Sequence, residues 1–191
     1  MDFEEFRLLG VEAQRKAFAE LTKSEQYDVY RSFEEFHQPF VDGFYKDQLG
    51  QVMYREGTVE HDGYFLKNGK KIAVEEKYRT RDYNDLLIEL IQDITYPMTA
   101  KNTGWFYQEK ADVLVYVICQ AERGKALFSA NKPSKIYTVN LPMLRGNLSP
   151  LLSAGAQYGL SASKRGKGFT INMSVPWDIL EMNGISKKYL V

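Results

Sequence analysis

Asp62, Glu75 and Lys77 have the types and the spacing to bind a divalent cation and to activate a water molecule. The dipeptide Asn68-Gly69 lies between them, flanked by two runs of strand character. Asn-Gly is the strongest short-range hairpin signal, because a type I′ turn needs positive φ at both central residues. A two-residue turn at this position places Asp62 directly opposite Glu75.

The predicted hairpin has one charged face and one apolar face. Successive side chains of a strand point to opposite sides, so Asp62, Glu75 and Lys77 share one face. The same register pairs the residues of the other face, which should point to the core: Gly63 with Val74 and Phe65 with Ile72. Two further pairs follow from it, Lys67 with Lys70 and Glu60 with Lys77.

The charged face has the composition of a site for metal-assisted attack on a phosphodiester. Two carboxylates directly opposite each other repel, at a cost of up to about 1 kcal/mol. A divalent cation between them turns that repulsion into binding, and oxygen ligands favour Mg²⁺ or Mn²⁺. Lys77 could orient a water molecule or a phosphate oxygen, and Arg79 and Arg81 continue the face with further positive charge. The alternative is an exposed hairpin with ordinary solvated charges.

Asp62, followed on the next strand by Glu75-Glu76-Lys77, resembles the motif of the PD-(D/E)XK nuclease superfamily. The similarity covers about residues 55–120 and continues into "LLIELIQD" and "TGWFYQEKADVLVYV", as in small nucleases of phage and mobile elements. The chain differs in having His61 where that motif has proline. The resemblance implies an α/β protein of restriction-endonuclease-like fold, with a central mixed β-sheet flanked by helices and, here, preceded by N-terminal helices.

The resemblance also implies a reaction, namely Mg²⁺- or Mn²⁺-dependent hydrolysis of nucleic-acid phosphodiester bonds, with DNA expected before RNA. Asp62 and Glu75 would hold the metal, helped by the backbone carbonyl of Glu76, and Lys77 would position or deprotonate the water. Glu89 would add an acid or orient Lys77. A homodimer is compatible with this family. The alternative is a catalytically inactive nucleic-acid-binding or assembly module of the same fold, favoured by zero net charge.

Residues 85–94, "DLLIELIQDI", fit either a strand or a helix. We favour a third strand, because only residues 81–84 link this stretch to the hairpin, as in a meander. On a strand, Glu89 lies among apolar residues and needs a partner such as a metal or Lys77. On a helix, Glu89 would instead form a solvated pair with Asp93.

Two further groups of charged residues are candidates for the site. The glycine-rich basic stretch at 164–168 could approach phosphates, although a solvated loop fits equally well. Its cationic residues are Lys164, Arg165 and Lys167. Glu34 and Glu35 precede the first expected strand on a helix, and some nucleases of the superfamily take an acid from such a helix. By pattern alone, these two glutamates are surface residues.

The remaining elements are expected from apolar spacing and from helix-start signals. Residues 4–23 have helical spacing, and a capping box at Thr22–Glu25 starts a second helix, expected to run to about His37 and to break or bend at Pro39. A further helical piece is expected to end at Gly50. Later strands are expected at 111–119, 135–140 and 169–175, and helices at 141–155 and 177–184.

Length and composition predict one domain over residues 1–191, with a helical part at 1–50. The resemblance implies that the catalytic core covers residues 55–120. Residues 1–60 carry 7 Lys and Arg against 13 Asp and Glu, whereas the remainder carries 18 against 12. This asymmetry permits a cationic surface for a nucleic-acid partner. We expect no membrane span and no signal peptide, and the single cysteine, Cys119, favours a cytoplasmic location.

Overall fold

The computed structural model describes residues 1–56, 61–91, 103–108, 110–162 and 169–190. Within these residues the strands form two sheets. The larger sheet contains, in spatial order, β1 (Tyr54–Arg55), β2 (Gly63–Lys67), β3 (Lys70–Arg79), β5 (Val113–Ile118), β6 (Lys135–Asn140) and β9 (Ser186–Leu190). The smaller sheet contains β4 (Asp85–Ile91), β8 (Phe169–Pro176) and β7 (Gln157–Ala162). Strands β1, β7 and β9 have no counterpart among the predictions above.

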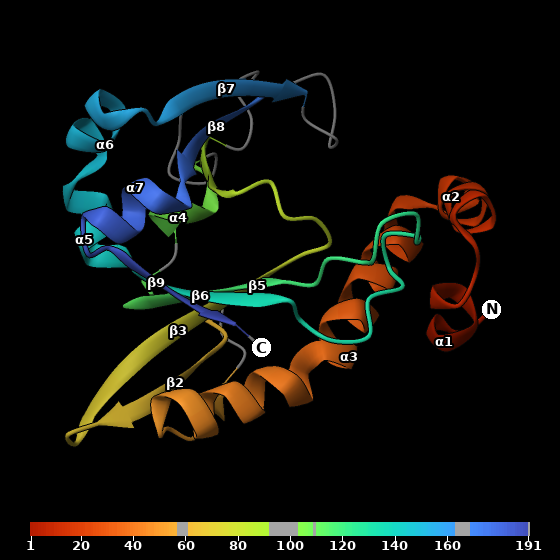
Figure 1. Cartoon of the computed structure of the whole chain (residues 1–191), viewed down its shortest axis with the longest axis horizontal. Helices are drawn as coiled ribbons and strands as arrows, with labels where there is room; N and C mark the ends of the chain where they lie inside the picture. The colour runs from red at the N-terminus through yellow and green to blue at the C-terminus, as the bar shows by residue number, and fades with distance from the viewer. Residues whose placement is uncertain (57–60, 92–102, 109, 163–168, 191) are drawn as a thin grey trace.

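Helices lie on both sides of the larger sheet (Figure 1). They are α1 (Phe3–Arg7), α2 (Val11–Glu20), α3 (Lys23–Leu49), α4 (Trp105–Gln108), α5 (Leu141–Gly146), α6 (Leu148–Ala154) and α7 (Trp177–Met182). The larger sheet is mixed, because β3 and β5 are parallel and its other pairs are antiparallel. The prediction of an α/β fold with a central mixed sheet flanked by helices is therefore confirmed.

Two hydrophobic cores cover the two faces of the larger sheet. On one face, α3 packs on side chains such as Phe65, Val74 and Val115, and Phe6 of α1 belongs to the same core. On the other, the smaller sheet and α4–α7 pack on Leu114 and Tyr116. Leu114 and Val115 are neighbours on β5 that join different cores, which is the alternation expected of a strand buried on both faces. Figure 1 shows the two layers on opposite sides of β5 and β6.

Helix α3 is one continuous helix from Lys23 to Leu49, so the predicted end near His37 is wrong and Pro39 does not break the helix. The capping box is present, because the Thr22 side chain accepts from the Glu25 backbone and the Glu25 side chain accepts from the Thr22 backbone. The helix continues past Pro39 to a left-handed cap at Gly50 (φ 63°). Packing keeps the helix continuous despite the hydrogen bond lost at the proline, because its buried residues lie on both sides of Pro39: Phe33, His37, Val41, Phe44 and Tyr45. Among the described residues, no helix has the length and apolar character to cross a membrane.

The hairpin has the register that Asn68-Gly69 predicts. Both turn residues have positive φ, 52° and 75°. Phe65 pairs with Ile72. The further pairs are Lys67 with Lys70 and Gly63 with Val74. The predicted pairing of Glu60 lies outside the described residues.

The stretch predicted as a third strand forms β4, but β4 does not extend the hairpin into a meander. It pairs with β8 in the smaller sheet, and the neighbour of β3 is β5. The connection after β3 carries the chain across to the other layer, because the apolar side chains of β4, among them Leu86 and Ile88, belong to the second core. The short link therefore joins two sheets.

Candidate active site

A cleft of about 520 Å³ lies between α3 and the part of β3 that extends beyond its pairing with β2. Helix α3 contributes residues between Tyr27 and Gln38. Arg55, Asp62 and residues 75–78 line the remainder. Three of the residues predicted to act together, Asp62, Glu75 and Lys77, thus line one cleft.

Asp62 is fixed to the backbone of β3 immediately before β2 begins. Its backbone N–H donates to the carbonyl of Val74, the residue that pairs with Gly63, at 3.0 Å, so the ladder slips by one residue here and the predicted pairing of Asp62 with Glu75 is not part of it. Its carboxylate Oδ2 accepts from the Glu76 backbone N–H at 2.7 Å. The carboxylate is therefore anchored to Glu76, the residue between the motif residues Glu75 and Lys77.

Glu75 and Lys77 form an ion pair on the same face of β3. The Lys77 ammonium donates to Glu75 Oε1. The Glu75 side chain is 8% exposed and that of Lys77 is 35% exposed, so the lysine is the member of the pair that solvent or a ligand can reach. Lys77 Nζ also lies 5.7 Å from the centroid of the Trp105 ring.

Glu76 points to the opposite face of β3 and is buried against α3. Its Oε1 accepts from the Tyr45 hydroxyl at 2.9 Å. Its Oε2 accepts from the Tyr78 hydroxyl at 3.0 Å and from Arg55 Nη1 at 3.1 Å. Arg55 in turn donates to Asp42 Oδ1 at 2.6 Å. The predicted contribution of Glu76 to a metal can therefore come only from its backbone, because its carboxylate already has three donors.

The tyrosines of this network remain protonated at any ordinary pH. Burial, followed by the negative charge of Glu76, raises the pKa of Tyr45 well above its usual value. The same causes raise the pKa of Tyr78. Both hydroxyls are thus permanent donors, and the buried charge of Glu76 is compensated by hydrogen bonds and by Arg55.

Glu34 belongs to the site, although its sequence pattern suggests an ordinary surface residue. Loss of hydration raises its pKa to about 7, and the negative charges of Asp62 and Glu76 act in the same direction, while Lys77 acts in the opposite one. These interactions place Glu34 across the cleft from the predicted motif. The available sequence signal is a polar stripe on α3, with Tyr27, Arg31, Glu34 and Gln38 three or four residues apart.

The two carboxylates of Asp62 and Glu75 fit a hard divalent cation. Mg²⁺ is usually held by one or two carboxylates, together with water and substrate phosphate oxygens. Within the described parts of the chain, no group of three or more His, Cys, Asp or Glu side chains forms a complete ligand set. Asp62 and Glu75 would thus supply two carboxylates, and not a complete ligand set, to such a cation.

Glu89 lies on β4 in the smaller sheet, opposite Asn172 of β8. It does not line the cleft that contains Lys77, within the residues described. Gly104, next to Trp105 in the chain, packs against Glu89. A Cβ atom at position 104 would lie 2.1 Å from the Glu89 carbonyl oxygen and 2.9 Å from the Glu89 Cγ atom. Gly104 therefore allows the segment before Trp105 to pack directly on Glu89.

The predicted phosphate-binding arginines lie away from the cleft. Arg79 Nη1 donates to Asp85 Oδ1 at 2.8 Å, and its guanidinium lies 4.9 Å from the centroid of Tyr83. Arg79 thus fastens the end of β3 to the start of β4. Arg81 is exposed just beyond β3. Lys164, Arg165 and Lys167 lie outside the described residues.

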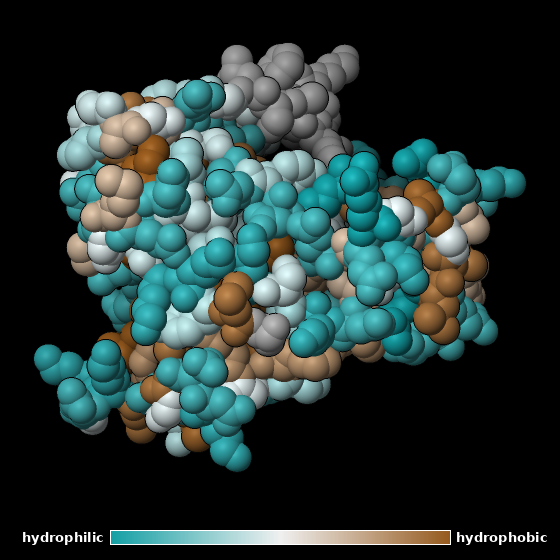
Figure 2. All heavy atoms as spheres, viewed as in Figure 1, coloured by the Kyte–Doolittle hydropathy of each residue, from teal (hydrophilic) through white to brown (hydrophobic). Residues whose placement is uncertain are grey.

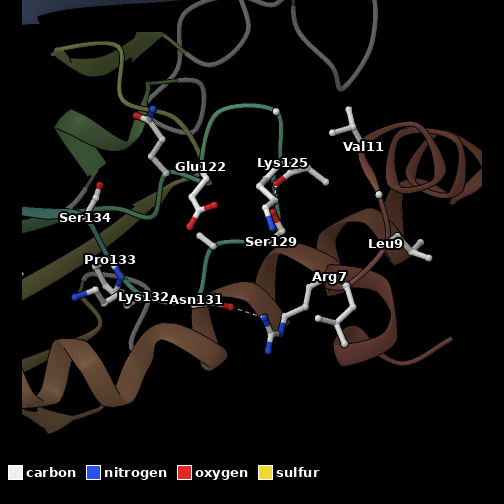
Figure 3. Close-up of a pocket in the computed structure, with 16 residues that line it drawn as sticks. Arg7, Leu9, Val11, Glu122, Lys125, Ser129, Asn131, Lys132, Pro133 and Ser134 are labelled. Carbon is white, nitrogen blue, oxygen red and sulfur yellow. Dashed lines mark hydrogen bonds between the residues drawn. The ribbon is translucent and has the colours of Figure 1, made fainter.

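A second cleft, of about 750 Å³, separates the α1–α2 segment from the connection between β5 and β6 (Figure 3). Arg7 Nη1 donates to Asn131 Oδ1 at 3.0 Å and joins its two walls. Lys125, Lys132 and Glu122 also line it. This cleft contains none of the residues predicted to act in catalysis.

Comparisons with known proteins give one weak resemblance. No family model and no curated protein matches the chain. Among solved structures, restriction endonuclease BglI bound to its DNA recognition sequence is similar over 85% of this chain and 72% of that one, with 9% sequence identity and a TM-score of 0.44. A similarity of this size concerns overall shape and does not extend to individual residues.

Proposed function

We propose that the cleft beside β3 hydrolyses phosphodiester bonds of nucleic acid, DNA before RNA, with the help of a divalent cation. The observation that carries the proposal is the placement of Asp62. Its carboxylate is hydrogen-bonded to the backbone of Glu76, between Glu75 and Lys77, at the wall of a cleft. Separate parts of the chain thus bring two acids and a lysine to one open site.

Asp62 and Glu75 would hold Mg²⁺ or Mn²⁺, with the Glu76 backbone carbonyl as a further oxygen ligand. When bound, such a cation lowers the pKa of a coordinated water and neutralises charge on the phosphate. Asp62 suits this role because its carboxylate already has a fixed orientation. Arg55 and the two tyrosines keep the Glu76 side chain away from the site, so the strand presents only one acidic side chain to each face.

Lys77 would position the attacking water or hold a phosphate oxygen, because its ammonium is the exposed member of the pair with Glu75. Glu34 would carry a proton, since a carboxyl with a pKa of about 7 can both accept and release one near neutral pH. Glu89 would act as a positioning residue, by supporting the segment at Gly104 that carries the Trp105 ring toward Lys77.

Nuclease activity with Mn²⁺ tests this proposal directly. Purified protein should cut DNA, and Lys77→Ala should lower the rate at least about 100-fold, the usual contribution of a proton-transfer or positioning group. Glu75→Ala should have a similar effect. Lys188→Ala, on β9 at the far edge of the same sheet, is the matched control and should cut at the wild-type rate. Wild-type rates in both site variants would contradict the assignment.

Metal binding gives an independent measurement. Calorimetry should detect Mn²⁺ binding to the wild type, and Asp62→Asn should weaken it while leaving the far-ultraviolet circular dichroism spectrum unchanged. Binding without any cutting would support the inactive binding module as the function. No heat of binding would contradict the proposed role of Asp62.

A further inference from the structure

The hairpin carries an exposed aromatic surface that the proposed chemistry does not use. Tyr54 of β1 and Tyr64 of β2 are directly paired, and their rings stack with centroids 5.2 Å apart and planes inclined by 17°. Lys71 Nζ lies 3.8 Å from the centroid of the Tyr64 ring. Tyr54 is 46% exposed. A lysine and two tyrosines thus form a continuous stack at the edge of the larger sheet.

This surface lies on the same side of the hairpin as Glu75 and Lys77. Residues 71, 73, 75 and 77 alternate with the buried set on β3 and share one face. Tyr64 is opposite Ala73, and residues directly opposite each other in an antiparallel pair point to the same side. Lys71 is six residues before Lys77, a distance of about 20 Å along a strand. The aromatic surface therefore leads along β3 toward the cleft.

The charge of the hairpin complements a polyanion. Residues 63–74 contain Lys67, Lys70 and Lys71 and no Asp or Glu. Lys71 pairs with Glu56 at 2.7 Å, and both side chains remain nearly half exposed. Figure 1 shows the tip between β2 and β3 projecting from the rest of the protein, and Figure 2 shows hydrophilic residues gathered there. The tip is thus open to a long ligand.

We propose that Tyr54, Tyr64 and Lys71 bind an unpaired strand of nucleic acid that leads into the cleft. The proposal rests on the proposed function, because it names the form of the substrate of that same site. An exposed aromatic ring can stack on a base only if the face of that base is not covered by its neighbours, and lysines neutralise the adjoining phosphates. A blunt duplex offers phosphates to this surface but covers the faces of its bases.

Binding of a fluorescent single-stranded oligonucleotide, measured by anisotropy in EDTA, tests the surface without any cutting. Tyr54→Ala combined with Lys71→Gln should weaken binding about 10-fold, because loss of one stacked base alone has an effect of this order. The slope of log K against log salt should become less steep by about 0.7, the contribution of one phosphate contact on a single strand. Both changed residues are exposed, so the melting temperature should stay close to that of the wild type.

Tyr158→Ala combined with Lys187→Gln is the matched control, because it removes an exposed strand tyrosine and a strand lysine elsewhere. The control should bind as the wild type does. Equal binding by the hairpin variant and the control would overturn the proposed surface, and so would equal weakening on a blunt duplex. If Lys77→Ala loses cutting but the hairpin variant binds as the wild type does, only this inference is overturned. If the hairpin variant binds more weakly but Lys77→Ala cuts at the wild-type rate, only the proposed reaction is overturned.

Discussion

The two faces of β3 place neighbouring glutamates in opposite situations. Glu75 and Glu76 are similarly buried, with 6% and 8% of their surfaces exposed. Glu76 has three hydrogen-bond donors fixed on α3, β1 and β3, whereas Glu75 pairs with the partly exposed Lys77. The contrast teaches that two carboxylates of equal burial can have different kinds of partner: tyrosines and an arginine for Glu76, and a partly exposed lysine for Glu75.

This difference has a physical basis in the cost of burying charge. A buried carboxylate is tolerated only when its lost hydration is replaced by hydrogen bonds or by a cation, and removing one partner leaves the other uncompensated. Glu76 therefore holds Tyr45, Tyr78 and Arg55 together. Because Asp62 is bound to the backbone N–H of the same residue, the packing of one face sets the position of a ligand on the other.

The largest expected effect in this comparison is on stability. Glu76→Ala should lower the free energy of unfolding by about 2–5 kcal/mol, because it leaves the hydroxyls of Tyr45 and Tyr78 without their buried acceptor. Glu75→Ala should cost only about 1 kcal/mol, because Lys77 can regain water. Urea unfolding followed by tryptophan fluorescence measures both variants. Equal losses would show that the two carboxylates have the same structural role.

A smaller effect should separate the two tyrosines. Tyr45→Phe should lower the free energy of unfolding by about 1.5–3 kcal/mol, since the hydroxyl bonds a charged group in a fully buried position. Tyr78→Phe should cost about 1 kcal/mol, because Glu76 Oε2 keeps its bond from Arg55. The same unfolding experiment applies. A larger loss of unfolding free energy for Tyr78→Phe than for Tyr45→Phe would show that the Tyr78 hydroxyl is the more important donor to Glu76.

The smallest effect concerns pH. The pKa of Glu34 is raised to about 7 in the folded protein, from 4.5 in the unfolded chain. Between these values the folded protein keeps a proton that the unfolded chain has lost, so stability should fall as pH rises through this window. Glu34→Gln should flatten the decline of melting temperature between pH 5 and 8, measured without divalent cations. An unchanged profile would show that Glu34 does not sense the opposing acids.

The local parts of the site are predictable from the sequence. Asn68-Gly69 determines the turn because few other pairs accept positive φ at both positions, and the turn then fixes the register as far as Gly63. The capping box at Thr22–Glu25 likewise fixes the start of α3. In both cases, short-range hydrogen bonds and backbone preferences decide the outcome without help from distant residues.

The long-range parts could not be predicted in the same way. The position of β4 depends on its pairing with β8, whose residues come about 80 positions later. The short link after β3 therefore wrongly predicts that β4 pairs with the hairpin. The fixed state of Glu76 depends on Tyr45 and Arg55 from other elements. Glu34 becomes a site residue only because α3 crosses the open end of the hairpin, and helical spacing alone does not tell which stripe faces a cleft.

The parallel pairing of β3 with β5 has a consequence for how the protein folds. The hairpin can close within microseconds, since its strands are joined by two residues. Val74 and Val113, by contrast, must find each other across a long intervening chain that includes a strand of another sheet. Contacts between such distant positions form slowly, because the entropy lost in closing the loop precedes any gain. A nascent chain released before β5 would therefore possess the motif residues but not the rigid support of β3.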